Sequence, residues 1–417
     1  MRNDISVIEQ IEKLIMPLIE SHVPEGTEAQ AVIDQWIHAL ATDSNLYCIP
    51  SIANNTKLKN DVTELLIKHE LFEDRQSFFD AVFGHLELSP STKPSFRFID
   101  LFAGIGGIRL GFQRYGGTCV FSSEFDKQAQ LTYKKNHGEF PFGDITLIPH
   151  DAIPDHDVLL AGFPCQPFSH AGLKLGIDDT RGTLFHDIAK ILEVKKPRFA
   201  LLENVRGLIS HDKGHTLKVI LKTLTEIGYS CNIPKDVIEN GSTKKIQELA
   251  KKMVLKSVDF GIPQNRQRIY IILWRDGELE HFTYPEPLEV EARVGDVLEK
   301  TPESKLTISD RLWAGHQRRK IQNKKNGKGF GYGLVTEDSP YTNTISARYY
   351  KDGSEVLIEQ KGKNPRKLSV REAARLQGFP DEFKPSDSSV QAYKQFGNSV
   401  TVTVVEAIAR ELVKELS

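Results

Sequence analysis

Short apolar runs, each followed by a turn that carries polar residues, limit most strongly how this chain can fold. Four β-prone runs occupy residues 96–102, 119–123, 158–161 and 199–202, and a fifth occupies 269–273. Helical patterns lie between several of these runs. This alternation favours an α/β fold with a mostly parallel, doubly wound sheet. Such sheets bind ligands at the carboxyl ends of their strands, so the polar residues there are the candidates for a functional site.

Cys165 follows the third run on a stiff turn. It stands between Pro164 and Pro167. Proline fixes its own φ and keeps the preceding residue out of the helical region. The turn therefore displays a thiol at the carboxyl end of a buried strand, which suits a nucleophile. A structural cysteine on a loop is the alternative.

A glycine turn at residues 103–107 follows the first run and opens a helix. Glycines let the backbone approach a ligand, and a helix N-terminus offers free N–H groups. The spacing is not the G-x-G-x-x-G of dinucleotide sites. Glu124 ends the second run, where an acid can accept ribose hydroxyls, while Asp144 can accept from a base amine and Ile145 can lie on a base face. Singly each acid is typical of a protein surface, but together they indicate an adenosine-bearing ligand.

A second carboxylate, Glu203, stands at the end of the fourth run and so near the cysteine. Burial raises the pKa of a carboxyl group and lets it act as an acid at neutral pH. Gln264, Arg266 and Arg268 precede or open the fifth run and share one face of an extended segment. We expect that face to meet a phosphate or a polar base. A solvated loop glutamate and an edge-strand row of salt bridges are the alternatives.

The overall charge gives no sign of nucleic-acid binding, because the formal net charge is −2. A nucleic-acid surface must therefore be local, and residues 311–328 hold seven Lys or Arg and no acid. The four cysteines form no C-x-x-C pair, which favours a reducing cytoplasm and predicts no disulfide framework and no metal site. The sequence shows no signal peptide and no apolar run as long as a membrane span.

The motifs of this chain resemble those of the DNA cytosine-5 methyltransferases, in particular the bacterial type II restriction–modification enzymes. The resemblance extends from Phe96 to the C-terminus, and five motifs stand in the order of the family. They occupy residues 98–107, 162–169, 203–205, 264–268 and 397–400.

The resemblance implies an S-adenosylmethionine-dependent methyltransferase fold with a smaller target-recognition domain. We expect a helical N-terminal extension at 1–94, a catalytic domain at 95–273, a target-recognition domain at 274–389 and a C-terminal segment at 390–417 that returns to the catalytic domain. The extension is interpreted as a packing collar. A DNA-binding regulator acting through these residues is the alternative.

The resemblance also assigns chemical roles. Cys165 is the nucleophile that adds to carbon 6 of cytosine, and Glu203 donates a proton or hydrogen bond to ring nitrogen 3. Arg268 approaches the cytosine oxygen, while Arg266 and Gln264 hold its surroundings. The methyl donor is S-adenosyl-L-methionine. Its predicted binding residues are Phe102, Gly104, Ile105, Gly106, Glu124, Phe125, Asp144, Ile145, Pro164, Asn398 and Ser399.

The implied partner is double-stranded DNA, from which the target base is flipped out of the stack. The loop after Ser169 is expected to close over the DNA, which lies between the two lobes. Thr344 is expected to hold backbone near the flipped base, and Arg348 and Lys351 to read guanine edges. The predicted DNA-binding residues are Gln166, Ser169, Arg318, Arg319, Thr344, Arg348 and Lys351.

The expected target is a short palindrome that contains CC and GG, such as GGNCC or CCNGG. The resemblance implies a monomer in the bacterial cytoplasm that protects host DNA from a partner restriction endonuclease. An RNA cytosine methyltransferase with the same pocket is one alternative. A cysteine hydrolase is another, although the sequence offers no clear histidine partner for Cys165.

Overall fold

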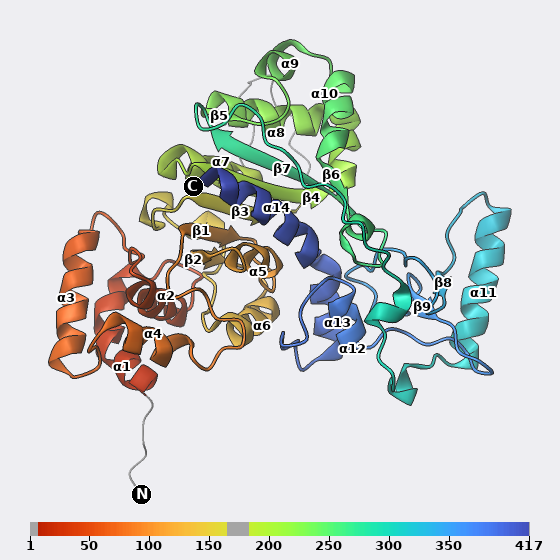
Figure 1. Ribbon diagram of the computed structural model, residues 1–417, viewed down its shortest axis with the longest axis horizontal. Coiled ribbons are helices and arrows are strands. Elements are labelled where there is room, and N and C mark those ends of the chain that lie inside the picture. Colours follow the sequence, from red (N-terminus) through yellow and green to blue (C-terminus); the bar gives the residue numbers. More distant parts are fainter. Residues whose placement is uncertain (1–6, 165–182, 417) are drawn as a thin grey trace, which may run out of the picture. The chain divides into compact units, whose positions relative to one another are not determined.

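The computed structural model of the chain describes residues 7–164 and 183–416, which form two compact units (Figure 1). Unit 1 comprises the described parts of Met1–Val254, Arg268–Tyr284 and Ala409–Ser417. Unit 2 comprises Leu255–Gln267 and Pro285–Ile408. The segment boundaries that the sequence suggests at 94, 273 and 389 do not coincide with these limits and stay predictions.

A mostly parallel sheet forms the centre of unit 1, as the apolar runs predict. Its strands lie in the order β2-β1-β3-β4-β7-β5, and β4 pairs antiparallel with β7. The first four residues of β3 are fully buried, as expected for a strand covered on both faces. The strands are β1 Phe96–Leu101, β2 Gly117–Ser123, β3 Val158–Gly162, β4 Phe199–Val205, β5 Tyr229–Ser230 and β7 Gln267–Arg275, with β6 Val254–Lys256 where the chain passes into unit 2.

Helices stand before and between these strands along the chain, and four helices precede the first strand. The helix α2 is buried along almost its whole length, so the N-terminal segment contributes to the core of unit 1. The helices are α1 Val7–Ile19, α2 Ala29–Thr42, α3 Asn55–Lys68, α4 Arg75–Phe83, α5 Gly107–Gln113, α6 Lys127–His137, α7 Leu184–Lys195, α8 His215–Glu226, α9 Lys235–Asn240, α10 Thr243–Ala250 and α14 Val402–Leu416, which begins in unit 2 and ends in unit 1.

Unit 2 contains little regular structure. Its strands β8 (Leu334–Val335) and β9 (Leu357–Ile358) pair in parallel. Arg366 donates to both carboxylate oxygens of the fully buried Glu372, at 2.7 and 2.8 Å, and so joins the loop after β9 to a helix. The helices of unit 2 are α11 Asp310–Lys325, α12 Val370–Arg375 and α13 Ser389–Asn398.

A buried ionic cluster ties the N-terminal helices to the sheet side of unit 1. Arg109 of α5 donates to Oε1 of Glu139 and, at 2.9 Å, to the hydroxyl of Tyr133. Nδ1 of His38 lies 2.8 Å from Oε2 of Glu139. Burial favours the protonated form of Glu139, but Arg109 and His38 outweigh it and lower the pKa of Glu139 to about 2.

This cluster makes the stability of unit 1 depend on pH. Because the folded pKa of Glu139 lies below its ordinary value of 4.5, its ion pair stabilises the fold above that value, and the stabilisation is lost as the pH falls toward 2. We expect protonation of Glu139 alone to lower the free energy of unfolding by about 2 kcal/mol between about pH 5.5 and about pH 3. The measurement is thermal unfolding over that range for the wild type and for Glu139→Gln. The variant should lose less stability on acidification, and equal slopes would contradict the assignment.

Candidate active site

The carboxyl ends of β3 and β4 bring the predicted acid next to the segment that leads to Cys165. Gly162 and Glu203 are partners in the parallel register. A Cβ at position 162 would lie 3.5 Å from Oε2 of Glu203, so this carboxylate reaches the end of β3. Cys165 itself lies outside the described residues, as do Gln166, Ser169 and the loop that follows.

Glu203 forms an ion pair with Arg268. The Nε of Arg268 lies 3.2 Å from Oε1 of Glu203, and the two side chains are only 16% and 11% exposed. Tyr270 lies directly opposite Glu203 on the antiparallel strand β7, so Arg268, two residues away, projects from the same face. The pair holds a carboxylate, which accepts hydrogen bonds, and a guanidinium, which donates them, together at one strand end.

Asn204 anchors the backbone in front of the predicted nucleophile. Its amide donates to the carbonyl of Phe163 at 2.9 Å and accepts from the N–H of Val205 at 2.8 Å. The side chain is only 2% exposed. Sequence reasoning placed Asn204 in a motif but gave it no role; its position directly after Glu203 is the signal that points to it. Asn204 thus fixes the strand end from which Pro164 emerges into solvent.

The ends of β1 and β2 form a second part of the site. Oε2 of Glu124 accepts from the backbone N–H of Gly104 and Oε1 from that of Asp126, both at 2.7 Å. Gly104 has a φ of +56°, and an added Cβ there would meet nothing within 4 Å. Burial raises the pKa of Glu124, although these N–H groups oppose the shift. An anchored carboxylate beside open backbone fits a ligand with paired hydroxyls, such as the ribose of an adenosine.

The remaining predicted cofactor residues of unit 1 differ in exposure. Phe125 is 77% exposed, whereas Ile105 and Ile145 are buried and Ile145 is part of the apolar core. Oδ1 of Asp144 accepts from the N–H and the hydroxyl of Thr146, at 3.0 and 2.8 Å. Phe102 has a φ of +55° and Gly106 one of +84°. The backbone at both ends of the turn between β1 and α5 is therefore in the left-handed region.

Gln264 and Arg266 do not present the polar face that their alternation with Arg268 predicts. Gln264 is fully buried; its amide donates to the carbonyl of Leu376 at 2.7 Å, and its Oε1 accepts from the N–H of Ile345 at 2.9 Å. Arg266 is 2% exposed and donates to the carbonyls of residues 345, 397 and 399. The backbone of distant segments covers these side chains, and the roles predicted for Gln264 and Arg266 around the cytosine stay predictions. Asn398 and Ser399 also lie in unit 2, apart in the chain from the other cofactor residues.

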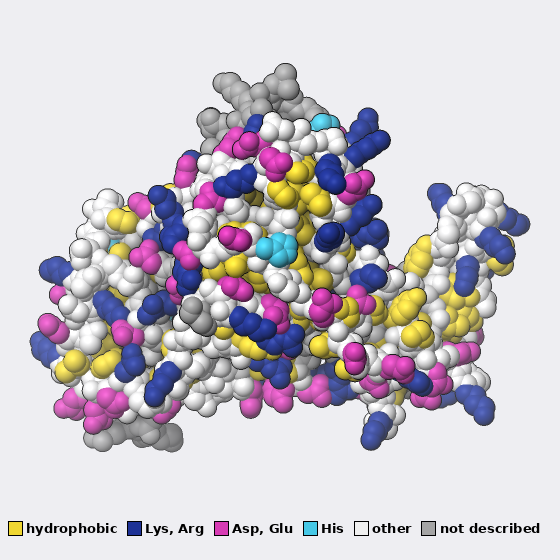
Figure 2. Space-filling model, turned by 45° about the horizontal axis from the view of Figure 1, so that its top comes forward, with side chains coloured by type: hydrophobic (Ala, Val, Ile, Leu, Met, Phe, Trp, Pro, Cys, Tyr) yellow, Lys and Arg dark blue, Asp and Glu magenta, His cyan; other side chains and the backbone are white. Residues whose placement is uncertain are grey.

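The predicted DNA-binding residues of unit 2 fall into two groups. Arg319 donates to Asp352 and to the carbonyl of Gly331, at 3.0 and 3.3 Å, and Thr344 donates to the carbonyl of Asn265 at 2.7 Å. These contacts of Arg319 and Thr344 hold neighbouring segments of unit 2 together. The side chains of the second group are exposed, and Figure 2 shows Lys and Arg gathered along the segment of α11. The second group is Arg318, Arg348 and Lys351.

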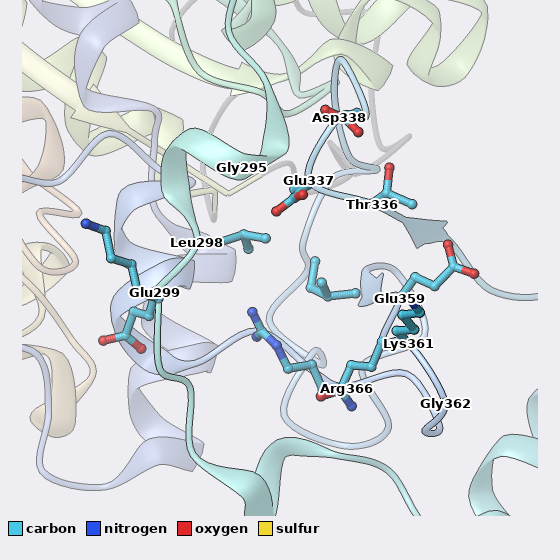
Figure 3. A pocket seen from close by; sticks show the side chains of 13 residues that line it. Gly295, Leu298, Glu299, Thr336, Glu337, Asp338, Glu359, Lys361, Gly362 and Arg366 are labelled. Atoms are coloured by element: carbon cyan, nitrogen blue, oxygen red, sulfur yellow. The ribbon is translucent and has the colours of Figure 1, made fainter.

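Unit 2 contains a cavity of about 830 Å³, and no predicted site residue is among the residues that line it (Figure 3). Its lining carries both signs of charge, with acids in the majority, which does not suit a phosphate. The charged residues that line it are Glu299, Lys300, Glu337, Asp338, Glu359, Lys361 and Arg366.

Within residues 7–164 and 183–416, no group of three His, Cys, Asp or Glu side chains is placed to hold a metal ion. None of the helices described for this chain has the length and apolar character needed to cross a membrane.

Comparison with known proteins gives a consistent result. Residues 96–414 match the family described as C-5 cytosine-specific DNA methylase. The chain is 56% identical to the type II methyltransferase M.SsoII of Shigella sonnei over 325 residues, which cover 77% of this chain and 81% of that protein. The chain is 39% identical to a DNA-cytosine methyltransferase of Escherichia coli (strain K12) over 454 residues, which cover 93% of this chain and 93% of that protein. The crystal structure of S. pombe Dnmt2 aligns with a TM-score of 0.59 at 22% identity, over 76% of this chain and 98% of that one, which shows the same fold.

Proposed function

Because this chain belongs to the C-5 cytosine-specific DNA methylase family and is a DNA (cytosine-5)-methyltransferase, we propose that it methylates one cytosine within a short palindromic duplex site containing CC and GG, of the GGNCC or CCNGG type. The observation that supports the transfer to cytosine is the strand-end arrangement of Glu203, Arg268 and Asn204 beside the segment that leads to Cys165. The similarity to type II methyltransferases supports a bacterial restriction–modification setting, in which the product protects host DNA from a partner endonuclease.

We propose S-adenosyl-L-methionine as the methyl donor. The residues that would hold it are Phe102, Gly104, Glu124 and Asp144. The open space beside Gly104 and the anchored carboxylate of Glu124 fit an adenosine. When bound, it supplies an electrophilic methyl group.

The residues of this chain activate the cytosine. Carbon 5 of cytosine is a weak nucleophile, and addition of the Cys165 thiolate to carbon 6 turns the ring into an enamine. For this step the carboxyl group of Glu203 carries a proton, which it donates in a hydrogen bond to ring nitrogen 3. This bond stabilises the charge that develops during the addition. In this proposal Arg268, which pairs with Glu203, donates to the cytosine oxygen. Carbon 5 of the enamine would then take the methyl group that the donor supplies, with S-adenosylhomocysteine as the leaving group. Loss of the carbon 5 proton to a base and expulsion of the thiolate then restore the aromatic ring.

The target base has to leave the duplex for this chemistry, at a cost of a few kcal/mol. We propose that unit 2 supplies the DNA contacts that offset this cost, with Arg348 and Lys351 reading bases and Arg318 binding phosphate. The experiment that tests the proposed function uses the full chain, S-adenosylmethionine with a labelled methyl group, and duplexes carrying GGNCC or CCNGG. Bisulfite sequencing then locates the methylated cytosine. Transfer to transfer RNA without transfer to DNA would contradict the proposal.

The two neighbouring arginines of α11 allow a discriminating test. Arg318→Ala should weaken binding to duplex DNA uniformly across sequences and reduce the slope of log affinity against log salt by about 1, because one phosphate contact is lost. Arg319→Ala should instead lower thermal stability, since Arg319 holds Asp352 and Gly331. Lys57→Ala, an exposed lysine of α3, is the control. An unchanged salt slope for Arg318→Ala would remove Arg318 from the DNA contacts.

A further inference from the structure

We propose that the N-terminal extension sets the affinity of this chain for its methyl donor, by holding the backbone of residues 139–147 in the conformation that binds. The inference rests on the proposed function, because it takes Asp144 in this segment as part of the donor site. The extension is here residues 7–94, and the segment 139–147 is called the adenine-side segment.

Two side chains of the extension bind the backbone of the adenine-side segment directly. Oδ2 of Asp34, on α2, accepts from the N–H of Phe140 at 2.8 Å. The hydroxyl oxygen of Thr27 accepts from the N–H of Gly143 at 3.2 Å. Asp34 is 5% exposed and is held in turn by Gln30 at 2.8 Å, so its carboxylate is a fixed acceptor.

The backbones of the two parts also approach very closely. A Cβ at Gly143 would lie 2.3 Å from the carbonyl oxygen of Gly26, so only glycine fits at position 143. The ring of Tyr47 packs against that of Phe142 with centroids 4.6 Å apart. The backbone N–H of Tyr47 is fixed by Oε1 of Gln35 at 2.7 Å. The extension therefore fits this segment in shape as well as in hydrogen bonding.

The opposite side of the segment is bound to the strand end that carries Glu124. The N–H of Glu124 donates to the carbonyl of Phe142 at 2.9 Å, and the hydroxyl of Ser123 donates to the carbonyl of Gly143 at 2.8 Å. The segment thus lies between the extension and β2. Contacts from the extension fix the distance between Asp144 and Glu124, the two acids proposed to hold the ends of the adenosine.

A chain with a loosened segment would bind the donor only while the segment keeps the correct conformation. The apparent affinity would therefore be the intrinsic affinity multiplied by the fraction of molecules in that conformation. Loss of one such hydrogen bond corresponds to about a three- to tenfold change. The effect falls on binding and not on the chemical step, because the extension contacts the segment that is proposed to hold the adenosine end of the donor and not its methyl group.

The test compares Thr27→Val, which keeps the shape but removes the acceptor, with Thr27→Ser, which keeps the hydroxyl. S-adenosylmethionine binding to the full chain without DNA is measured by calorimetry, and hydrogen exchange is measured for amides 140–147. Thr27→Val should bind the donor about three- to tenfold more weakly and exchange faster, with kcat unchanged at saturating donor. Thr27→Ser should behave as the wild type.

The control is Asp74→Ala, which removes the N-cap of α4 in the extension without touching the adenine-side segment. Donor binding by Thr27→Val equal to that of the wild type, or weakening by Asp74→Ala to the same extent, would overturn the inference while leaving the proposed function intact. A wild-type chain that binds no S-adenosylmethionine would overturn the proposed donor and this inference with it.

Discussion

Replacement of Cys165 by alanine is expected to reduce methyl transfer to duplex DNA by a factor of at least ~10³, because the alanine side chain cannot form the bond to carbon 6. Binding of S-adenosylmethionine and the thermal stability should stay close to those of the wild type. The measurement is single-turnover transfer of a labelled methyl group, together with calorimetry of donor binding. Transfer at the normal rate would remove Cys165 from the mechanism.

The other cysteines supply the matched control. Cys48, Cys119 and Cys231 are buried. Burial raises the pKa of Cys231 to about 11 and raises that of Cys119 as well, so both thiols are protonated at neutral pH and poorly reactive. Cys231→Ala should therefore keep full transfer activity.

Replacement of Glu203 by glutamine should have the second-largest effect, a loss of about 10²- to 10³-fold in kcat. Glutamine keeps the size of the side chain, but its weakly acidic amide stabilises the developing charge at ring nitrogen 3 far less. The measurement is kcat at saturating DNA and donor, with Glu193→Gln, an exposed acid on α7, as control.

The ion pair with Arg268 adds a structural effect that has to be separated from the chemical one. Removal of one partner of a largely buried pair leaves the other charge uncompensated, at a cost of up to about 3–5 kcal/mol. Thermal unfolding of Glu203→Gln therefore accompanies the kinetics. A variant that remains folded and binds S-adenosylmethionine but transfers methyl groups at the normal rate would show that Glu203 has no part in the reaction.

The sequence is sufficient to predict five of the seven strands of the sheet and the residues at their ends, because both depend on local pattern; the short strands β5 and β6 were not predicted. The run at 158–161 became β3, and that at 199–202 became the first part of β4. The direction of β7 was not predicted. An apolar run shows that a strand exists, but its direction depends on the path of the connecting chain, and β7 pairs antiparallel with β4.

Contacts between distant residues limit the prediction of the site. Alternation places Gln264 and Arg266 on one face, but what covers that face is backbone from residues 345, 376 and 397, about 80 to 130 positions away. In the same way, a helical pattern in the extension does not reveal that Asp34 binds Phe140, 106 residues further on. Asn204 lay within a motif, yet its role depends on a carbonyl 41 residues earlier.

The covalent bond between Cys165 and carbon 6 can be tested with a duplex whose target cytosine carries fluorine at carbon 5. Fluorine replaces the proton that must leave before the thiolate can be expelled, so the bond between Cys165 and carbon 6 should persist after methyl transfer. We expect a denaturant-stable complex of protein and DNA with the wild type and with Cys231→Ala, linked through the peptide that contains Cys165, and no complex with Cys165→Ala. A wild-type chain that methylates the ordinary duplex but forms no such complex, or forms it through another residue, would contradict the account.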